Sequence, residues 1–380
     1  MTLSLPGHAH PYQMHEPVEF AGGEAPQSRV LFAAAHVVAD PLSDNALGAP
    51  AAVDWDATMA FRRHLWRHGL GVAEAMDTAQ RGMGLDWAAT RELIRRSAAE
   101  AGAGERLACG AGTDQLTGSG HDLDAVVAAY EEQCAVVEDA GAQVILMASR
   151  QLAATARGPE DYHRVYGRLL SQAREPVIVH WLGPMFDPAL EGYWGSADLD
   201  IATDVLVDLL AEHAAQVDGV KVSLLDAQRE IDLRRRLPAG VRCYTGDDFH
   251  YPELIEGDDL GSSDALLGVF DPIAAAASEA VRALDKSEFV RYHAIFAPTV
   301  PMARHLFGAP TYYYKTGIVF LAWLSGHQQH FRMVGGLESA RSVPHLVRLF
   351  VLADEAGLLP DPALAEQRMR TFLQMAGVAQ

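Results

Sequence analysis

The chain has 380 residues, of which 49% are hydrophobic and 21% are charged. This length and balance are typical of a globular protein with a full hydrophobic core, and they exclude a mostly disordered chain. The formal net charge of −20 disfavours a nucleic-acid-binding surface. No apolar run approaches the roughly 20 residues that span a membrane, so neither nucleic acid nor membrane is an expected partner.

The N-terminal sequence and the cysteines indicate a compartment. The stretch "MTLSLPGHAHPYQMHEP" lacks the basic start and continuous apolar core of a secretory signal, so we expect a cytoplasmic protein. Cys109, Cys134 and Cys243 are widely separated and form no CxxC pair. This spacing argues against a disulfide framework and against a cysteine zinc site.

From about residue 29 to 270, short β-type apolar runs alternate with longer segments of helical periodicity. The spacing of the runs suits right-handed β-α-β units. Eight units in about 240 residues predict a (β/α)8 TIM barrel, which usually has about 250 residues. The runs begin near Val30, Val72, Arg106, Gln143, Val177, Gly219, Val241 and Ala265.

Helix start and stop signals lie between these runs. Residues 54–69 and 200–216 have the acidic first turns that favour a helix N-terminus, and Gly141 suits the left-handed residue after a helix. After Pro272 the strand signals end and helical patterns continue. We therefore predict an N-terminal extension at residues 1–28, the barrel at 29–272 and a C-terminal helical region at 273–380.

One lysine stands inside a predicted strand, in "VDGVKVSLLD". Lys221 is unusual there because ionised ammonium groups are seldom buried. A lysine that pairs with a carboxylate at the barrel rim is one explanation. The functional interpretation is an amine kept partly neutral by desolvation, which attacks a carbonyl and forms a Schiff base as in class I aldolases.

Neighbouring motifs favour the second explanation. Gly219, Val220 and Lys221 are preceded by "VIVHWLGP" at 177–184 and followed by "CYTGDDF" at 243–249. In this order they resemble the dihydrodipicolinate synthase and N-acetylneuraminate lyase superfamily, whose sixth strand carries a Schiff-base lysine in G-[IV]-K. The resemblance implies a divergent class I aldolase-type barrel that takes a small keto substrate without a cofactor or metal, as a homodimer or homotetramer.

The resemblance also implies site residues. His180 falls on the family's proton-relaying tyrosine, and its imidazole, with an ordinary pKa near 6.5, would move protons beside Lys221. At the second strand the family's carboxylate-binding G-T-T-G-E reads "AMDTAQRG", which keeps Thr78 and adds Asp77. A carboxylate there would repel an acid group, so a keto sugar is a candidate beside a keto acid, although Arg81 could restore an anion site. The predicted substrate contacts are Thr78, Asp77, Tyr244, Asp247, Asp248 and His36.

The predicted function is a Schiff-base-forming lyase, either an aldolase or a dehydratase, and two other classes stay open. A metal-dependent barrel lyase, isomerase or hydrolase would draw its ligands from strand ends, but it would leave Lys221 without a role. A barrel that only binds a ligand would have lost catalysis. The ligands of the metal alternative would be His36, Glu74, His180, Asp247 or His250.

Overall fold

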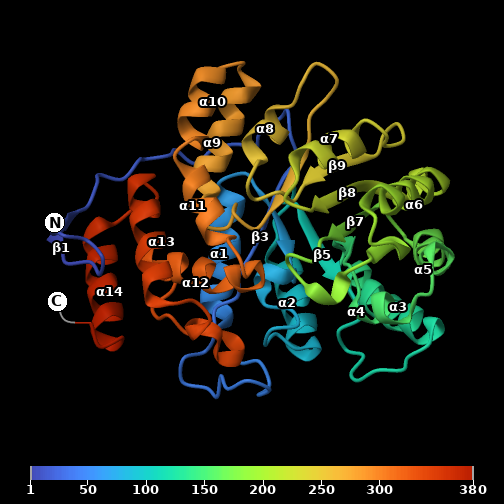
Figure 1. Ribbon diagram of the computed structural model, residues 1–380, viewed down its shortest axis with the longest axis horizontal. Helices are drawn as coiled ribbons and strands as arrows, with labels where there is room; N and C mark the ends of the chain where they lie inside the picture. The colour runs from blue at the N-terminus through green and yellow to red at the C-terminus, as the bar shows by residue number, and fades with distance from the viewer. Residues whose placement is uncertain (1, 379–380) are drawn as a thin grey trace.

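The computed structural model describes residues 2–378, in which eight parallel strands close into a barrel surrounded by helices (Figure 1). Around the barrel each strand pairs with its neighbours in the chain, and β10 closes the ring on β3. The predicted (β/α)8 TIM barrel with a C-terminal helical part is therefore confirmed. The barrel strands are Leu31–Ala34 (β3), Gly71–Glu74 (β4), Leu107–Ala111 (β5), Gln143–Leu146 (β6), Val177–Leu182 (β7), Val217–Ser223 (β8), Arg242–Thr245 (β9) and Asp264–Leu267 (β10).

Parallel barrel strands are covered on both faces, which explains why they appear in the sequence as continuous apolar runs. Every residue of β7 is buried, for example. Alternate side chains point into the barrel, where Phe32, Ile145, Ile178, Tyr244 and Leu266 belong to one packed cluster. The barrel interior is thus a solid core, and a site can form only at its ends.

The outer helices begin where aspartates cap them. Asp54 accepts a hydrogen bond from the Ala57 amide at 3.0 Å. Asp122 and Asp198 likewise accept hydrogen bonds from amides in the first turns of the helices that follow them. Gly141 has φ +77°, as the sequence predicted. The helices are Trp55–Arg67 (α1), Trp87–Glu100 (α2), Leu123–Asp139 (α3), Arg150–Thr155 (α4), Pro159–Gln172 (α5), Leu199–Glu212 (α6), Ala227–Arg234 (α7), Tyr251–Glu256 (α8) and Ala274–Asp285 (α9).

The C-terminal region adds five further helices, the last of which stack on the side of the barrel that carries α1 (Figure 1). The N-terminal extension lies against them, because Tyr12 and the His15 backbone amide donate hydrogen bonds to buried Asp354 at 2.7 and 3.1 Å. The two ends of the chain therefore fold together. These elements are Thr2–Leu3 (β1), Tyr12–Gln13 (β2), Phe289–Phe296 (α10), Thr299–Leu306 (α11), Tyr314–Leu324 (α12), Val343–Glu355 (α13) and Pro362–Met375 (α14).

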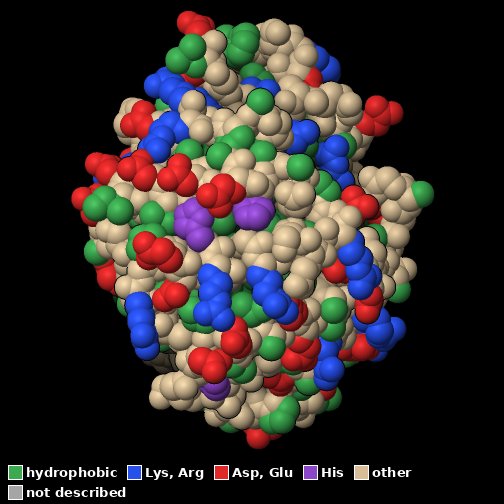
Figure 2. All heavy atoms as spheres, turned by 90° about the vertical axis from the view of Figure 1, so that its right-hand side faces the viewer, with side chains coloured by type: hydrophobic (Ala, Val, Ile, Leu, Met, Phe, Trp, Pro, Cys, Tyr) green, Lys and Arg blue, Asp and Glu red, His purple; other side chains and the backbone are tan. Residues whose placement is uncertain are grey.

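The surface over α5 and α6 mixes acidic and basic side chains instead of gathering one sign of charge (Figure 2). Ion pairs such as Arg229 with Asp200 and Arg236 with Asp204 link neighbouring helices there. Within residues 2–378, none of the helices combines the length and the apolar character that crossing a membrane requires.

A buried ion pair fastens the barrel to its first helices. Glu74 ends β4 but points outward, where Arg62 of α1 donates to both of its carboxylate oxygens at 2.7 and 2.8 Å. Ser97 of α2 adds a third hydrogen bond at 2.6 Å, and neither Arg62 nor Glu74 has exposed side-chain surface. Glu74 is therefore a structural residue of the barrel wall, and it does not face the strand-end site.

We expect Glu74→Gln to destabilise the protein by about 3 kcal/mol, because it leaves the Arg62 charge buried and unpaired. The measurement is urea unfolding followed by circular dichroism. Glu92→Gln is the matched control, because Glu92 pairs with Arg95 and Arg96 on the outside of α2 and such pairs contribute about 0–1 kcal/mol. Equal losses in the two variants would contradict the structural role of the buried pair.

Candidate functional site

Lys221 enters the barrel interior from β8. Side chains alternate along a strand, so Gly219, Lys221 and Ser223 share the inner face. Lys221 is only 7% exposed, and no described residue forms a hydrogen bond or an ion pair with its amine. A free buried amine at the mouth of a closed barrel is the arrangement that nucleophilic lysine chemistry requires.

Burial lowers the pKa of the Lys221 ammonium below its ordinary value, and the nearby carboxylates Asp77 and Asp248 oppose this shift. Desolvation is the larger of the two effects. A greater fraction of the amine is therefore neutral near pH 7 than for a surface lysine, and only the neutral amine has the lone pair that attacks a carbonyl.

The glycine of "CYTGDD" lets the next strand end pass close to this amine. A Cβ atom on Gly246 would lie 2.2 Å from the Ser223 hydroxyl and 3.0 Å from Cε of Lys221. No side chain fits there, so the motif owes its glycine to this close approach.

The Lys221 pocket, as we name the small cavity beside this amine, opens into a larger outer cavity of about 190 Å³. Asp77 and Leu182 line both. The pocket's floor and walls combine carboxylates, hydroxyls and apolar side chains. They are Met76, Asp77, Thr78, Leu182, Phe186, Lys221, Ser223, Asp248, Gly268 and Tyr314.

A short 3-10 turn at Asp77–Ala79 (η1) brings two predicted residues to the pocket. Thr78 is buried, and its hydroxyl forms a hydrogen bond of 2.8 Å with the Tyr314 hydroxyl. No described residue forms a hydrogen bond with the Asp77 carboxylate. These two predicted substrate contacts therefore both line the Lys221 pocket.

His180 lies directly beside Lys221, because the two residues are paired in the register of β7 and β8. It is fully buried, and its Nε2 lies 3.2 Å from the Ser223 hydroxyl while its Nδ1 has no partner in the described structure. Burial, and secondarily the Lys221 charge, hold the pKa of His180 well below its ordinary value. The imidazole is thus neutral near pH 7, and it reaches the Lys221 pocket through the Ser223 hydroxyl.

The two aspartates of "CYTGDD" point in different directions. Asp248 faces Lys221 and accepts a hydrogen bond from the Val269 amide at 2.8 Å. Burial raises the pKa of Asp248 to about 7. Asp247 instead accepts hydrogen bonds from the Phe249 and His250 amides, at 2.8 and 3.1 Å, and contacts the His250 ring at 2.9 Å. Asp247, predicted as a substrate contact, therefore caps the turn before α8 and does not line the Lys221 pocket.

Tyr244 and His36 also lie apart from the pocket. The Tyr244 ring leans toward the N-terminal end of the barrel, where its hydroxyl donates to Asp218 at 2.6 Å. His36 pairs with Asp271 at 2.8 Å and packs on the Phe61 ring. Neither of these two predicted substrate contacts lines the Lys221 pocket, because a strand position fixes the face from which a side chain leaves but not the direction in which a long side chain extends.

Two other expectations concern an anion site at Arg81 and a metal site. Arg81 donates hydrogen bonds to the Gly110 carbonyl at 2.8 Å and to Gln133 at 2.7 Å, and it pairs with Asp114, so it forms no anion site beside Lys221. In the part of the chain that the structure describes, no three His, Cys, Asp or Glu side chains are grouped as metal ligands. The ligands of the metal alternative are dispersed, since Glu74 faces α1.

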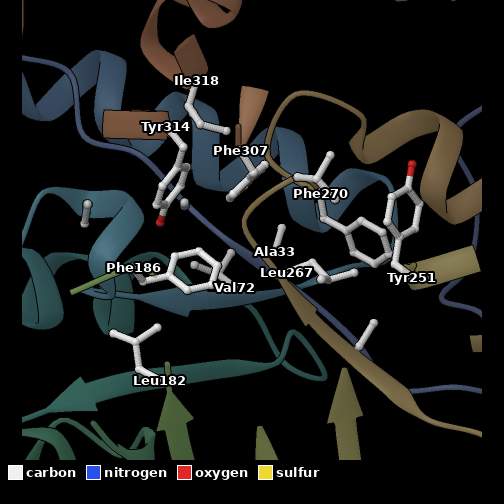
Figure 3. Packing of buried hydrophobic residues seen from close by; sticks show 14 of the residues in the cluster. Ala33, Val72, Leu182, Phe186, Tyr251, Leu267, Phe270, Phe307, Tyr314 and Ile318 are labelled. Atoms are coloured by element: carbon white, nitrogen blue, oxygen red, sulfur yellow. The ribbon is translucent and has the colours of Figure 1, made fainter. Parts of the chain in front are cut away.

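An aromatic cover of the pocket, which the sequence did not predict, comes from the C-terminal region. Tyr314 begins α12 of the C-terminal region and stacks on Phe307 with 4.4 Å between ring centroids. Figure 3 shows these two rings above Phe186, which follows β7.

Lys315 is the second buried lysine near the site. It is 2% exposed, its amine donates to the Tyr312 carbonyl at 3.3 Å, and burial lowers its pKa to about 8. The amine also lies 4.6 Å from the Tyr312 ring centroid. It has partners and does not line the Lys221 pocket, so it is a cation at the edge of the site.

Comparison with known proteins agrees with this fold. A family model described as "Protein of unknown function (DUF993)" matches residues 3–378, and no curated protein matches the chain. A putative dihydrodipicolinate synthetase from Pseudomonas aeruginosa has a TM-score of 0.63 at 15% identity, covering 86% of this chain and 99% of its own.

Two similar structures were solved in complex with pyruvate. The chloride-inhibited dihydrodipicolinate synthase from Acinetobacter baumannii has a TM-score of 0.63 at 16% identity, covering 87% of this chain and 100% of its own. YagE, a prophage protein of the same family from E. coli K12, has a TM-score of 0.65 at 11% identity, covering 92% and 99%. The predicted resemblance is thus confirmed for the fold, at the low identity of a divergent member.

We expect the free energy of unfolding of Asp248→Asn, measured relative to that of the unchanged protein, to increase as the pH rises. Asp248 has a raised pKa, so the stability that its proton contributes is complete below pH 4 and is lost as the pH rises through about 7. The variant lacks this loss, so its relative stability should increase by roughly 2–3 kcal/mol between pH 5 and pH 8. Urea unfolding at both pH values measures it, and a difference that does not change with pH would contradict the buried carboxyl.

Proposed function

The chain belongs to the DUF993 family of proteins of unknown function, and we propose that it is a lyase whose Lys221 forms a Schiff base with a ketone substrate. The observation that carries the proposal is the buried, unpartnered Lys221 amine with its lowered pKa, at the end of a barrel strand where such barrels have their active sites. The fold that this chain shares with dihydrodipicolinate synthases supports it.

The first chemical step belongs to Lys221. Its lone pair attacks the ketone carbon. The carbonyl oxygen takes up one proton from an acid in the pocket and a second from the attacking nitrogen, and it leaves as water to give an iminium. The iminium then accepts the electron pair of a bond to the neighbouring carbon, which forms an enamine. An aldolase breaks a carbon–carbon bond in this way, and a dehydratase loses a β-hydroxyl through the same enamine.

Proton transfer falls to the hydroxyls that line the pocket. Ser223 faces the substrate and is bound to the neutral His180 imidazole, so a proton taken from the substrate passes through Ser223 to His180. The Thr78 and Tyr314 pair offers a second hydroxyl route from the opposite wall. Phe186 and Leu182 give the pocket two apolar walls, and polar contacts are stronger beside apolar surface than in bulk water.

Borohydride trapping tests the Schiff base. The sequence has only three lysines, at positions 221, 286 and 315, so peptide mapping after reduction assigns an adduct without ambiguity. With a reactive ketone we expect the protein to gain the ketone's mass less one oxygen, at Lys221. Lys221→Ala should abolish the adduct, whereas the matched control Lys286→Ala should keep it. An adduct that persists at Lys315 in Lys221→Ala would overturn the assignment.

His180→Gln should separate bond formation from proton transfer. The glutamine keeps a polar side chain beside Ser223 but is no base, so turnover should fall by about 100-fold or more while the borohydride adduct at Lys221 still forms. Stopped-flow or quench measurements of the adduct, set beside steady-state turnover of the same ketone, give both rates. Unchanged turnover would remove His180 from the mechanism.

A further inference from the structure

We propose that the Lys221 pocket selects a neutral, polyhydroxylated ketone and rejects 2-oxo acids. This inference rests on the proposed Schiff-base function and specifies its substrate class. The decisive position is the group attached directly to the ketone carbon, because it must lie inside the pocket once that carbon is bonded to Lys221.

The charges on the pocket wall oppose an acid at that position. Apart from Lys221, the ionisable acids and bases of the wall are Asp77, Asp248 and the Tyr314 phenol, and none of these is a cation. A 2-oxo acid would bring a carboxylate into the small pocket beside Asp77. Like charges repel each other at such close range.

Other cations close to the site do not line the Lys221 pocket. Arg81 donates to Gln133 and to the Gly110 carbonyl. Lys315 donates to the Tyr312 carbonyl and interacts electrostatically with Asp77, so it offsets part of the Asp77 charge from outside the pocket. Arg150 pairs with Asp187 and lines the outer cavity, not the Lys221 pocket. Among the residues that line the pocket, Lys221 is therefore the one cation that could pair with a carboxylate.

The hydrogen-bonding groups of the pocket instead suit the hydroxyl groups of a substrate. A carboxylate only accepts hydrogen bonds, and no described residue donates to the Asp77 side chain, so Asp77 lacks a donor that a substrate hydroxyl would supply. Ser223 and the paired Thr78 and Tyr314 hydroxyls both donate and accept. Hydroxyl groups also line the outer cavity, where the Thr113 and Ser149 hydroxyls form a hydrogen bond of 2.6 Å.

The test compares matched ketones by borohydride trapping of the full-length protein. Dihydroxyacetone and pyruvate have the same three-carbon skeleton, and pyruvamide is a neutral counterpart of pyruvate. For each ketone, the adduct yield at Lys221 is divided by the yield with the free amine of Nα-acetyllysine. This ratio corrects for the different intrinsic reactivities of the three ketones toward an amine. We expect Lys221 to trap dihydroxyacetone at least tenfold more than pyruvate, and pyruvamide more than pyruvate.

A variant then isolates the charge. Asp77→Asn keeps the size of the side chain and should raise pyruvate trapping relative to dihydroxyacetone at least tenfold. Asp200→Asn makes the same change on the outer surface of α6 and should leave the ratio unchanged. If Asp77→Asn does not fold, the comparison of pyruvamide with pyruvate in the unchanged protein still decides.

The outcomes separate the two proposals. Preferential trapping of pyruvate at Lys221 would overturn the substrate class and leave the Schiff base intact. Equal trapping of pyruvate and pyruvamide would also overturn it, because the charge would then have no effect. The absence of any adduct at Lys221 with all three ketones would overturn the proposed function, and this inference with it.

Discussion

The desolvation of one amine is the constraint around which the site is organised. Lys221 is held at the mouth of a closed barrel, where burial removes most of the water that would solvate an ammonium group, and its pKa falls as a result. Burying a charge is costly unless a counter-charge is near, and Asp77 and Asp248 supply it. The two carboxylates limit how far the amine is neutralised, and they also set which chemical groups a substrate can place beside it.

The barrel fixes where this site can be. A larger hollow of about 870 Å³ lies at the opposite end, lined by strand beginnings such as Leu107 and Gln143 and by the charged side chains of Arg106, Glu138 and Arg174. It has no buried amine. Volume alone would make that hollow the candidate active site. The smaller pocket is the better candidate because it holds the buried amine, whose altered pKa depends on a partly closed environment.

The C-terminal region completes the pocket. Without α12 the barrel would have no Tyr314 hydroxyl for Thr78 to bind, and without α11, which Phe307 follows, no aromatic ring would cover Gly268 at the end of the eighth strand. A Cβ atom on Gly268 would lie 3.0 Å from the Phe307 ring, so the barrel and the added helices are fitted to each other at this point. The helical region is therefore part of the site as well as of the fold.

The sequence by itself determined the barrel and its lysine. Buried parallel strands appear as apolar runs at regular spacing, so all eight could be located, and a lysine within such a run is conspicuous. Asp77, Thr78 and Asp248 followed from their places after strands. Tertiary structure decided the rest: Tyr244 leans to the other end, Asp247 caps a turn, and Tyr314 arrives from 236 residues away to meet Thr78. Strand alternation fixes a side chain's face locally, whereas its final direction and its distant partners depend on how the whole chain packs.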